Sequence, residues 1–437
     1  MLESIFRLKE HGTTWRREVL AGLTSFAAMA YILAVNPAIL EAAGMDRGAL
    51  VTVTAMGAAI GCFLMAALAN YPIALAPGMG MNAFFALTVC QGMGVPWQGA
   101  LGIVFWNGVL FLILSLSGVR ERVVESVPES LKLGVQVGIG LFIAFIGLQH
   151  TGLVVDHPAT LASLGNLKSA SAWLALAGVG VTAVMLGRSI PGGVLVAILG
   201  VSLVGCLVPA GDGRVTALPE SWFSLPASPR GTSFALDLSY PFTNWREAWP
   251  LVFAFLFVDL FDSLGTLVGV SRTAGLLDSR GRLPRMNRAL IADAGATLSG
   301  AVLGTSPVTA YVESAAGVKV GGRTGLTTVV VGISFLVALF FTPVILAIPA
   351  LATGSALVVI GLTMMEGARH LAYDDFSEYL PAILTMLITP LAFSISDGIG
   401  LGFLAYVVLK VGMGRAKEVR GLTYLVAGLF ALRYIFL

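Results

Sequence analysis

APGMGMNAFF (76–85) and GTSPVTAYVESAAGV (304–318) decide the fold of this chain, because neither stretch can form a complete membrane-spanning helix. Each begins with glycine, proline and small residues that interrupt a helix, and continues as a short apolar helical run with one polar side chain, Asn82 or Glu313. Interrupted segments in corresponding halves of a chain are typical of a transporter's binding site. The alternative is the ordinary kinking of membrane helices by glycine and proline. In the transporter reading, each half-helix begins inside the membrane, where its free N–H groups suit a polar or anionic ligand group.

The composition indicates a membrane protein. Of the 437 residues, 57% are hydrophobic and only 11% are charged, and the mean hydropathy is +0.89. This leaves too little polar surface to cover a soluble protein. A bilayer core of ~30 Å requires ~20 helical residues per crossing. We therefore predict an all-α polytopic membrane protein with fourteen transmembrane segments. The predicted spans are 17–35, 51–69, 72–90, 99–117, 131–148, 171–187, 190–208, 248–268, 289–303, 306–317, 324–347, 353–367, 379–394 and 398–412.

The last apolar run, 421–437, either spans the membrane or lies in its interface, and the sequence leaves both readings open. Most of the 26 Lys and Arg residues fall on the side of the N-terminus when the spans are threaded in order. Because short cytoplasmic loops collect basic residues, we predict a multi-pass protein of the cell membrane with a cytoplasmic N-terminus. The basic residues are explained by this topology, so the net charge of +2 does not indicate a nucleic-acid partner.

The chain divides into two halves. Residues 1–208 hold seven predicted spans, 209–247 form a proline-rich extracytoplasmic connector, and 248–437 hold the other seven. An odd number of spans per half makes the second half enter from the opposite side, which is the arrangement of an inverted repeat.

Metal and enzyme chemistry are disfavoured. The three cysteines stand singly in apolar runs and the four histidines lack HxxxH spacing, so we expect no disulfide, metal site or cofactor. Neither a GxSxG nor an HExxH motif is present in the sequence. Two acids on one helical turn do not form a catalytic dyad.

Ionisable residues concentrate in the segment VDLFDSLGTLVGV (258–270). Its polar side chains recur at i, i+3, i+4 and i+7, which predicts one shared helical face: Asp259, Asp262, Ser263 and Thr266. A carboxylate at the bilayer centre costs at least ~2.5 to 3.5 kcal/mol. No Lys or Arg lies in the predicted spans 248–268, 289–303 and 306–317. The acids should therefore face a cavity, a partner or a proton, and proton binding would then be coupled to ligand binding.

Another interpretation of the acids remains open. Asp262, or Asp293 in span 289–303, is alternatively a structural residue that caps a half-helix or binds backbone amides.

An acid-lined site accepts hydrogen bonds from N–H groups, whereas Asn82 both donates and accepts them. This favours a heterocycle with ring N–H and carbonyl edges over an inorganic anion. Phe84 or Phe85 offers a stacking surface, although two adjacent residues cannot both point at one site.

Together with YILAVNPAIL (31–40), these motifs resemble the azaguanine-permease (AzgA-like) branch of the nucleobase:cation symporter-2 family. The resemblance runs nearly end to end. It implies proton-coupled uptake of adenine, guanine and hypoxanthine, with xanthine or uracil symport as the alternative. It also implies a homodimer and a 7+7 inverted repeat with short strands before the half-helices of segments 3 and 10. In this fold a core domain, about 17–117 and 248–347, moves against a gate domain, about 131–208 and 353–437.

The resemblance also implies roles for single residues. Substrate contacts would come from the side chains of Asn82, Phe84, Asp259 and Glu313, and from strand residues beside the site: Gly80, Met81, Ala310 and Val312. Asp259, Asp262 and Glu313 would carry the coupling proton. Many relatives have FDT where this chain has Asp262 followed by Ser263, so the hydroxyl group is kept.

Overall fold

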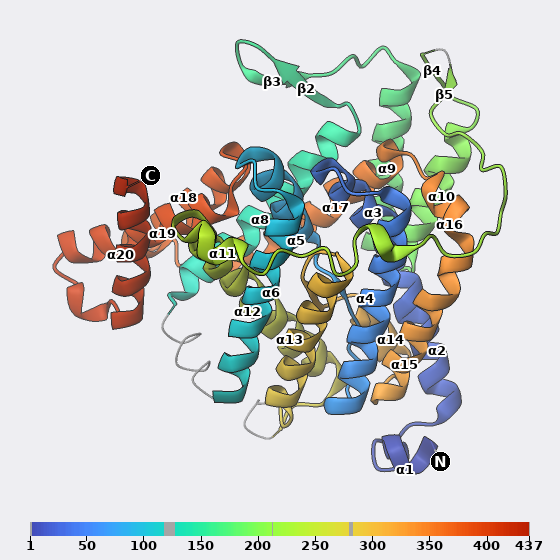
Figure 1. Cartoon of the computed structure of the whole chain (residues 1–437), viewed down its shortest axis with the longest axis horizontal. Helices are drawn as coiled ribbons and strands as arrows, with labels where there is room; N and C mark the ends of the chain where they lie inside the picture. Colours follow the sequence, from blue (N-terminus) through green and yellow to red (C-terminus); the bar gives the residue numbers. More distant parts are fainter. Residues whose placement is uncertain (1, 118–126, 212, 279–282, 437) are drawn as a thin grey trace.

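The structure is a computed structural model that describes residues 2–117, 127–211, 213–278 and 283–436. Most long helices run between the end of the molecule that carries α1 and the end that carries the hairpins β2–β3 and β4–β5 (Figure 1). Within the described residues, nine helices are long and apolar enough to cross a membrane. The prediction of a polytopic all-α membrane protein is confirmed.

The first half contains α1 (Leu2–Phe6), α2 (Trp15–Met29), α3 (Ile32–Leu40), η1 (Glu41–Ala43), α4 (Arg47–Leu68), β1 (Leu75–Pro77), α5 (Met79–Ala83), the π-type helix η2 (Phe84–Gly92), α6 (Trp97–Ser117), α8 (Glu129–His150), β2 (Val154–His157), β3 (Leu161–Leu164), α9 (Ala170–Gly187) and α10 (Gly193–Gly205).

The connector and second half contain β4 (Pro209–Ala210), β5 (Gly213–Arg214), η3 (Pro229–Gly231), α11 (Tyr240–Thr243), α12 (Trp245–Ala274), α13 (Met286–Leu303), β6 (Val308–Ala310), α14 (Ser314–Val320), α15 (Gly325–Ala338), η4 (Leu339–Phe341), α16 (Thr342–Leu346), α17 (Ala350–Met364), η5 (Met365–His370), α18 (Phe376–Leu391), α19 (Ile395–Gly412), η6 (Ala416–Glu418) and α20 (Gly421–Phe436).

The fold is the predicted 7+7 inverted repeat, and its third and tenth segments are the broken ones. Each consists of a short strand followed by a short helix: β1 precedes α5, and β6 precedes α14. The apolar run that follows α19 forms the helix α20.

The two broken segments meet through their strands. β1 pairs antiparallel with β6, with Leu75 opposite Ala310 and Pro77 opposite Val308. The ladder is extended by hydrogen bonds from the Gly78 amide to the Pro307 carbonyl (2.9 Å) and from the Tyr311 amide to the Ala74 carbonyl (3.0 Å). Irregular backbone is tolerated at membrane depth only where its polar groups find partners. This pairing supplies those partners.

The predicted positions of the strand residues are partly wrong. Gly80 and Met81 lie in the helix α5, not in a strand. Pro77 has no N–H group to continue the ladder, and Gly78 leads in extended conformation into the helix that begins at Met79. Ala310 is the last residue of β6, and Val312 lies beyond the end of that strand.

The helices pack chiefly within two groups. In the first, α2, α4, α6, α12, α13, α14 and α15 surround the paired strands; we call it the strand-centred group. The second group consists of α8, α9, α10, α17, α18 and α19. Within it, α8 and α17 touch backbone to backbone: a Cβ atom at Gly361 would lie 2.4 Å from the Gly140 carbonyl oxygen. Small residues allow such close helix packing in membranes.

Candidate functional site

The two groups leave open space beside the paired strands. A Cβ atom added at Gly265 or Gly269 of α12 would meet nothing within 4 Å. Asp262 on the same helix is exposed, and Val312, beside the start of α14, is 62% exposed. Glu313 is half-buried and lies near enough to Asp262 for the two carboxylates to interact electrostatically. An accessible acidic site therefore lies where α12 passes the start of α14.

The start of α13 lies at the end of the molecule that carries the N-terminus. Asn70, in the turn after α4, donates to the Phe6 carbonyl beside α1 (3.1 Å). Its neighbour Tyr71 accepts a hydrogen bond from the Arg285 amide (3.1 Å), just before α13. The C-terminal end of α12, from which the chain continues to α13, is therefore on the α1 side. The exposed Gly269 lies nearer to that end than Asp262 does.

The two acids of α12 point in different directions. Asp259 is fully buried, and its Oδ2 accepts hydrogen bonds from Asn107 Nδ2 of α6 (3.2 Å) and from Thr297 Oγ1 of α13 (3.3 Å). Asp262 is exposed beside Glu313. The predicted shared polar face is therefore divided: Asp259 and Ser263 turn into the strand-centred group, whereas Asp262 borders the opening.

Asp293 belongs to the buried side of this division. It is fully buried on α13 and accepts a hydrogen bond from the Ser263 hydroxyl. Ser263 Oγ in turn lies 2.8 Å from Thr309 Oγ1 of β6. In the described structure, Oδ1 of Asp259 and Oδ1 of Asp293 have no hydrogen-bond partner. A second, enclosed acid pair thus lies behind the strands.

The side chain of Asn82 is held by a hydrogen bond to α3. It is fully buried on α5, and its Nδ2 donates to Asn36 Oδ1 of α3 (3.0 Å). Asn36 Nδ2 contacts the hydroxyls of Thr54 (2.8 Å) and Thr305 (3.0 Å). This leaves Asn82 Oδ1 without a partner in the described structure. Asn36 was not predicted as a site residue. Its position as a polar residue within the apolar stretch YILAVNPAIL could have indicated a functional role.

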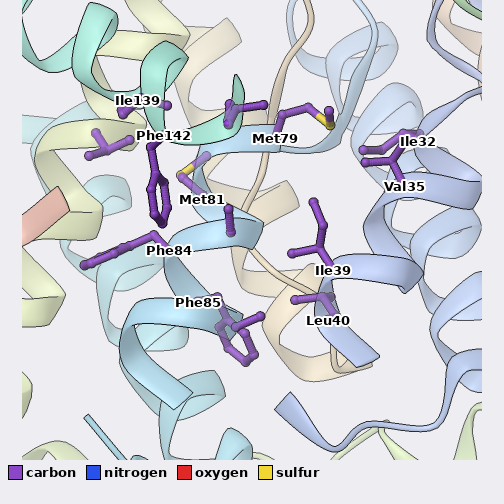
Figure 2. Packing of buried hydrophobic residues seen from close by; sticks show 14 of the residues in the cluster. Ile32, Val35, Ile39, Leu40, Met79, Met81, Phe84, Phe85, Ile139 and Phe142 are labelled. Atoms are coloured by element: carbon purple, nitrogen blue, oxygen red, sulfur yellow. The ribbon is translucent and has the colours of Figure 1, made fainter. Parts of the chain in front are cut away.

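Of the two adjacent phenylalanines, Phe84 faces the second helix group. Figure 2 shows its ring beneath Phe142 of α8, whereas Phe85 points in another direction. Phe84 also packs against Phe255 of α12, with 4.7 Å between the ring centroids, and is fully buried. Met81 is buried as well. A Cβ atom at Gly80 would lie 2.4 Å from Ile139 Cγ2, so α5 touches α8 at this glycine.

One contact was not predicted at all. Tyr31, between α2 and α3, donates a hydrogen bond from its hydroxyl to Glu313 Oε1 (2.5 Å). Within the described residues, no salt bridge joins a basic side chain to Asp259, Asp262, Asp293 or Glu313. No three His, Cys, Asp or Glu side chains of that part of the chain form a metal-binding group. The absence of a cofactor remains a prediction.

Comparison with protein families gives a match over residues 16–401 to the model Xan_ur_permease, described as a permease family. The chain is 47% identical to the putative permease MJ0326 of Methanocaldococcus jannaschii, covering 100% of this chain and 98% of that protein. It is 43% identical to the adenine permease AdeP of Escherichia coli strain K12, covering 100% and 96%. It is 41% identical to the guanine/hypoxanthine permease PbuG of Bacillus subtilis strain 168, covering 100% of both.

Among solved structures, the transmembrane domain of the cyanobacterial bicarbonate transporter BicA superposes with a TM-score of 0.68. The match covers 88% of this chain and 97% of that one, at 16% sequence identity. SLC26A9 superposes with a TM-score of 0.64 at 13% identity, covering 91% and 65%. At such low identity these structures establish the fold and do not bear on the substrate.

Proposed function

Because this chain belongs to the permease family represented by Xan_ur_permease, we propose that it takes up the purine nucleobases adenine, guanine and hypoxanthine together with a proton. The family and its relatives are permeases, so the chain is a membrane transporter and not an enzyme. The observation that carries the substrate proposal is the full-length similarity to permeases named for adenine and for guanine and hypoxanthine.

The geometry of the acidic site supports a substrate rich in N–H groups. Asp262 and Glu313 border the opening, and carboxylates are acceptors that match the ring and exocyclic N–H donors of a purine. We therefore assign direct substrate contact to Asp262 and Glu313. Asn82 is fully buried, as Asp259 is, so its unpartnered Oδ1 supports the site from behind in this conformation. Val312, Gly80, Met81, Ala310 and Phe84 shape the surroundings.

This assignment changes the role expected for Asp259. Its carboxylate is fully buried between α6 and α13, where a substrate has no access in this conformation. We propose that Asp259 acts from behind the site, and that the coupling proton is held among Asp259, Asp262 and Glu313. A proton on this cluster offsets the cost of burying carboxylates without a cationic partner.

The division into two helix groups supports an alternating-access mechanism. We propose that the strand-centred group is the core domain, about 17–117 and 248–347, and that the second group is the gate domain, about 131–208 and 353–437. The core carries the site past the gate between the two faces of the cell membrane. In this proposal the N-terminus is cytoplasmic, the connector 209–247 is extracytoplasmic, and the transporter is a homodimer.

Competition uptake in proteoliposomes tests the proposal. With an imposed inward proton gradient, radiolabelled hypoxanthine should accumulate, and excess adenine or guanine should compete with it. Competition by xanthine or uracil alone would instead favour the alternative, a xanthine or uracil symporter. Accumulation that a protonophore leaves unchanged would refute proton coupling while preserving purine transport.

A further inference from the structure

Tyr31 occupies the interruption between two helical pieces. α2 ends at Met29 and α3 begins at Ile32, so the tyrosine lies in the short turn between the two helices of the first segment. Its side chain is 1% exposed, and its neighbours Ala30 and Ile32 are also buried. The ring is therefore enclosed in the hydrophobic core, which restricts its movement.

The ring of Tyr31 ends at the acidic site. Its hydroxyl donates a hydrogen bond to Glu313 Oε1, with 2.5 Å between the two oxygens. Glu313 stands immediately before α14, a helix that packs against α2. The tyrosine thus joins the first segment of the chain to the acid of the tenth.

A hydrogen bond of this length to a carboxylate is charge-assisted and strongly orienting. It engages Oε1 of Glu313 and so fixes the orientation of the carboxylate, whose other oxygen is Oε2. Holding a recognition group in place before binding reduces the entropy lost when the ligand binds. A freely rotating Glu313 would present the same charge but a poorer geometry.

We propose that Tyr31 is a positioning residue for substrate recognition, which orients Glu313 so that its Oε2 accepts a purine ring N–H. The inference rests on the proposed purine transport and adds to it a residue that does not itself read the substrate. In this proposal, Tyr31 makes Glu313 selective for one N–H position of the purine ring. Glu313 without this hydrogen bond would not have that selectivity.

The test uses Tyr31→Phe in the full-length protein in proteoliposomes, with hypoxanthine and its 1-methyl, 7-methyl and 9-methyl derivatives. The 1-methyl group removes the N1–H donor, whereas the 7-methyl and the 9-methyl group each remove the single imidazole N–H donor. We expect Tyr31→Phe to raise KM for hypoxanthine about fivefold to tenfold, with the maximal rate within about twofold of wild type. For every derivative that lacks the N–H read by Glu313, KM should be the same in variant and wild type.

The matched control is Tyr406→Phe, which removes a hydroxyl that also contacts a glutamate, Glu378 at 3.3 Å, in the second helix group. Its KM should equal that of wild type. An unchanged KM in Tyr31→Phe would overturn the inference, as would an equal rise for hypoxanthine and all three derivatives. A Tyr31→Phe protein with a lowered melting temperature and reduced maximal rate at normal KM would assign Tyr31 a structural role. Wild-type protein that transports no purine would refute the proposed function itself, which is a separate result.

Discussion

Asp259 and Asp262 lie three residues apart on α12, yet only Asp262 reaches the open site beside Glu313. Asp259 is fully buried against Asn107 and Thr297. Three residues advance a helix by about 300°, which leaves the two side chains about 60° apart. This angle is enough to place Asp259 in the packed interior and Asp262 at the opening. The two acids therefore have different tasks.

Asp262→Asn should weaken purine binding at least about tenfold, because an amide replaces an ionised acceptor. Asp259→Asn should preserve binding and abolish proton-driven accumulation. Equilibrium binding to purified protein, measured beside gradient-driven uptake in proteoliposomes, separates the two effects. Glu313→Gln serves as a reference that loses both. Equal loss of binding in Asp259→Asn and Asp262→Asn would contradict the division of roles.

A hydrogen bond links η2, which follows α5 in the first broken segment, to the second helix group. Thr88 Oγ1 of η2 donates to the Phe393 carbonyl between α18 and α19 (2.5 Å). Phe393 has a left-handed backbone with φ of 51° and packs against Phe142 and Phe145, each at 5.5 Å between centroids. The contact is therefore formed in the conformation that exposes Gly265.

Thr88→Val should shift the protein away from this conformation about fivefold, since one hydrogen bond contributes ~1 kcal/mol. The measurement is the rate at which a hydrophilic maleimide labels Gly265→Cys, in a background lacking the native cysteines. The rate should fall with Thr88→Val and stay unchanged with Thr88→Ser, which keeps the hydroxyl. Equal rates in both variants would exclude Thr88 as a link between the groups.

Glu18 stabilises the start of α15. This glutamate is fully buried on α2, and it accepts hydrogen bonds from the Arg323 amide (2.9 Å), the Thr327 amide (3.2 Å) and the Thr327 hydroxyl (2.6 Å). A carboxylate at a helix N-terminus is favourable because it satisfies unpaired N–H groups.

Glu18→Gln should destabilise the protein by roughly 2–3 kcal/mol, because the side-chain NH₂ group turns a donor toward other donors. Thermal unfolding in detergent measures the loss as a lowered melting temperature. Glu10→Gln is the matched control on the exposed N-terminal segment. If Glu18→Gln melted at the same temperature as Glu10→Gln, Glu18 would not stabilise the start of α15.

Acidification should loosen a surface cluster near α19. Hydrogen bonds from Ser377 and Arg415 lower the pKa of Asp375 to about 2, and those from Arg415 and Lys410 lower the pKa of Glu418 to about 2. Ordinary values are about 4 for both residue types. Because the folded pKa is depressed, the cluster stabilises the fold fully above about pH 4, and this contribution is lost as the pH falls toward 2.

Arg415→Gln should therefore lower the melting temperature at pH 6, and the difference from wild type should shrink as the pH is lowered from 4 toward 2. Arg246→Gln, a change at an exposed arginine outside this cluster, should give no pH-dependent difference. A difference for Arg415→Gln that is constant over the whole pH range would rule out titration of these carboxylates as the cause.

Much of the fold was predictable because it depends on local properties. Long apolar runs imply spans wherever they occur, and Gly and Pro interrupt a helix at 76–85 and 304–318 whatever surrounds them. The positions of single residues at those interruptions were less predictable. Gly80 and Met81 were expected in a strand, but the strand ends at Pro77 and the helix α5 begins at Met79.

The sequence by itself determined that the chain crosses a membrane, that its two halves correspond, and that acids without nearby basic residues lie in α12, α13 and beside α14. Only the tertiary structure decided which of these acids a ligand reaches. It buried Asp259 and Asp293, exposed Asp262, and brought Tyr31 to Glu313 across 282 positions of the chain. The reason is that periodicity defines the face of a helix to within a broad arc, whereas accessibility depends on the neighbours that cover that arc.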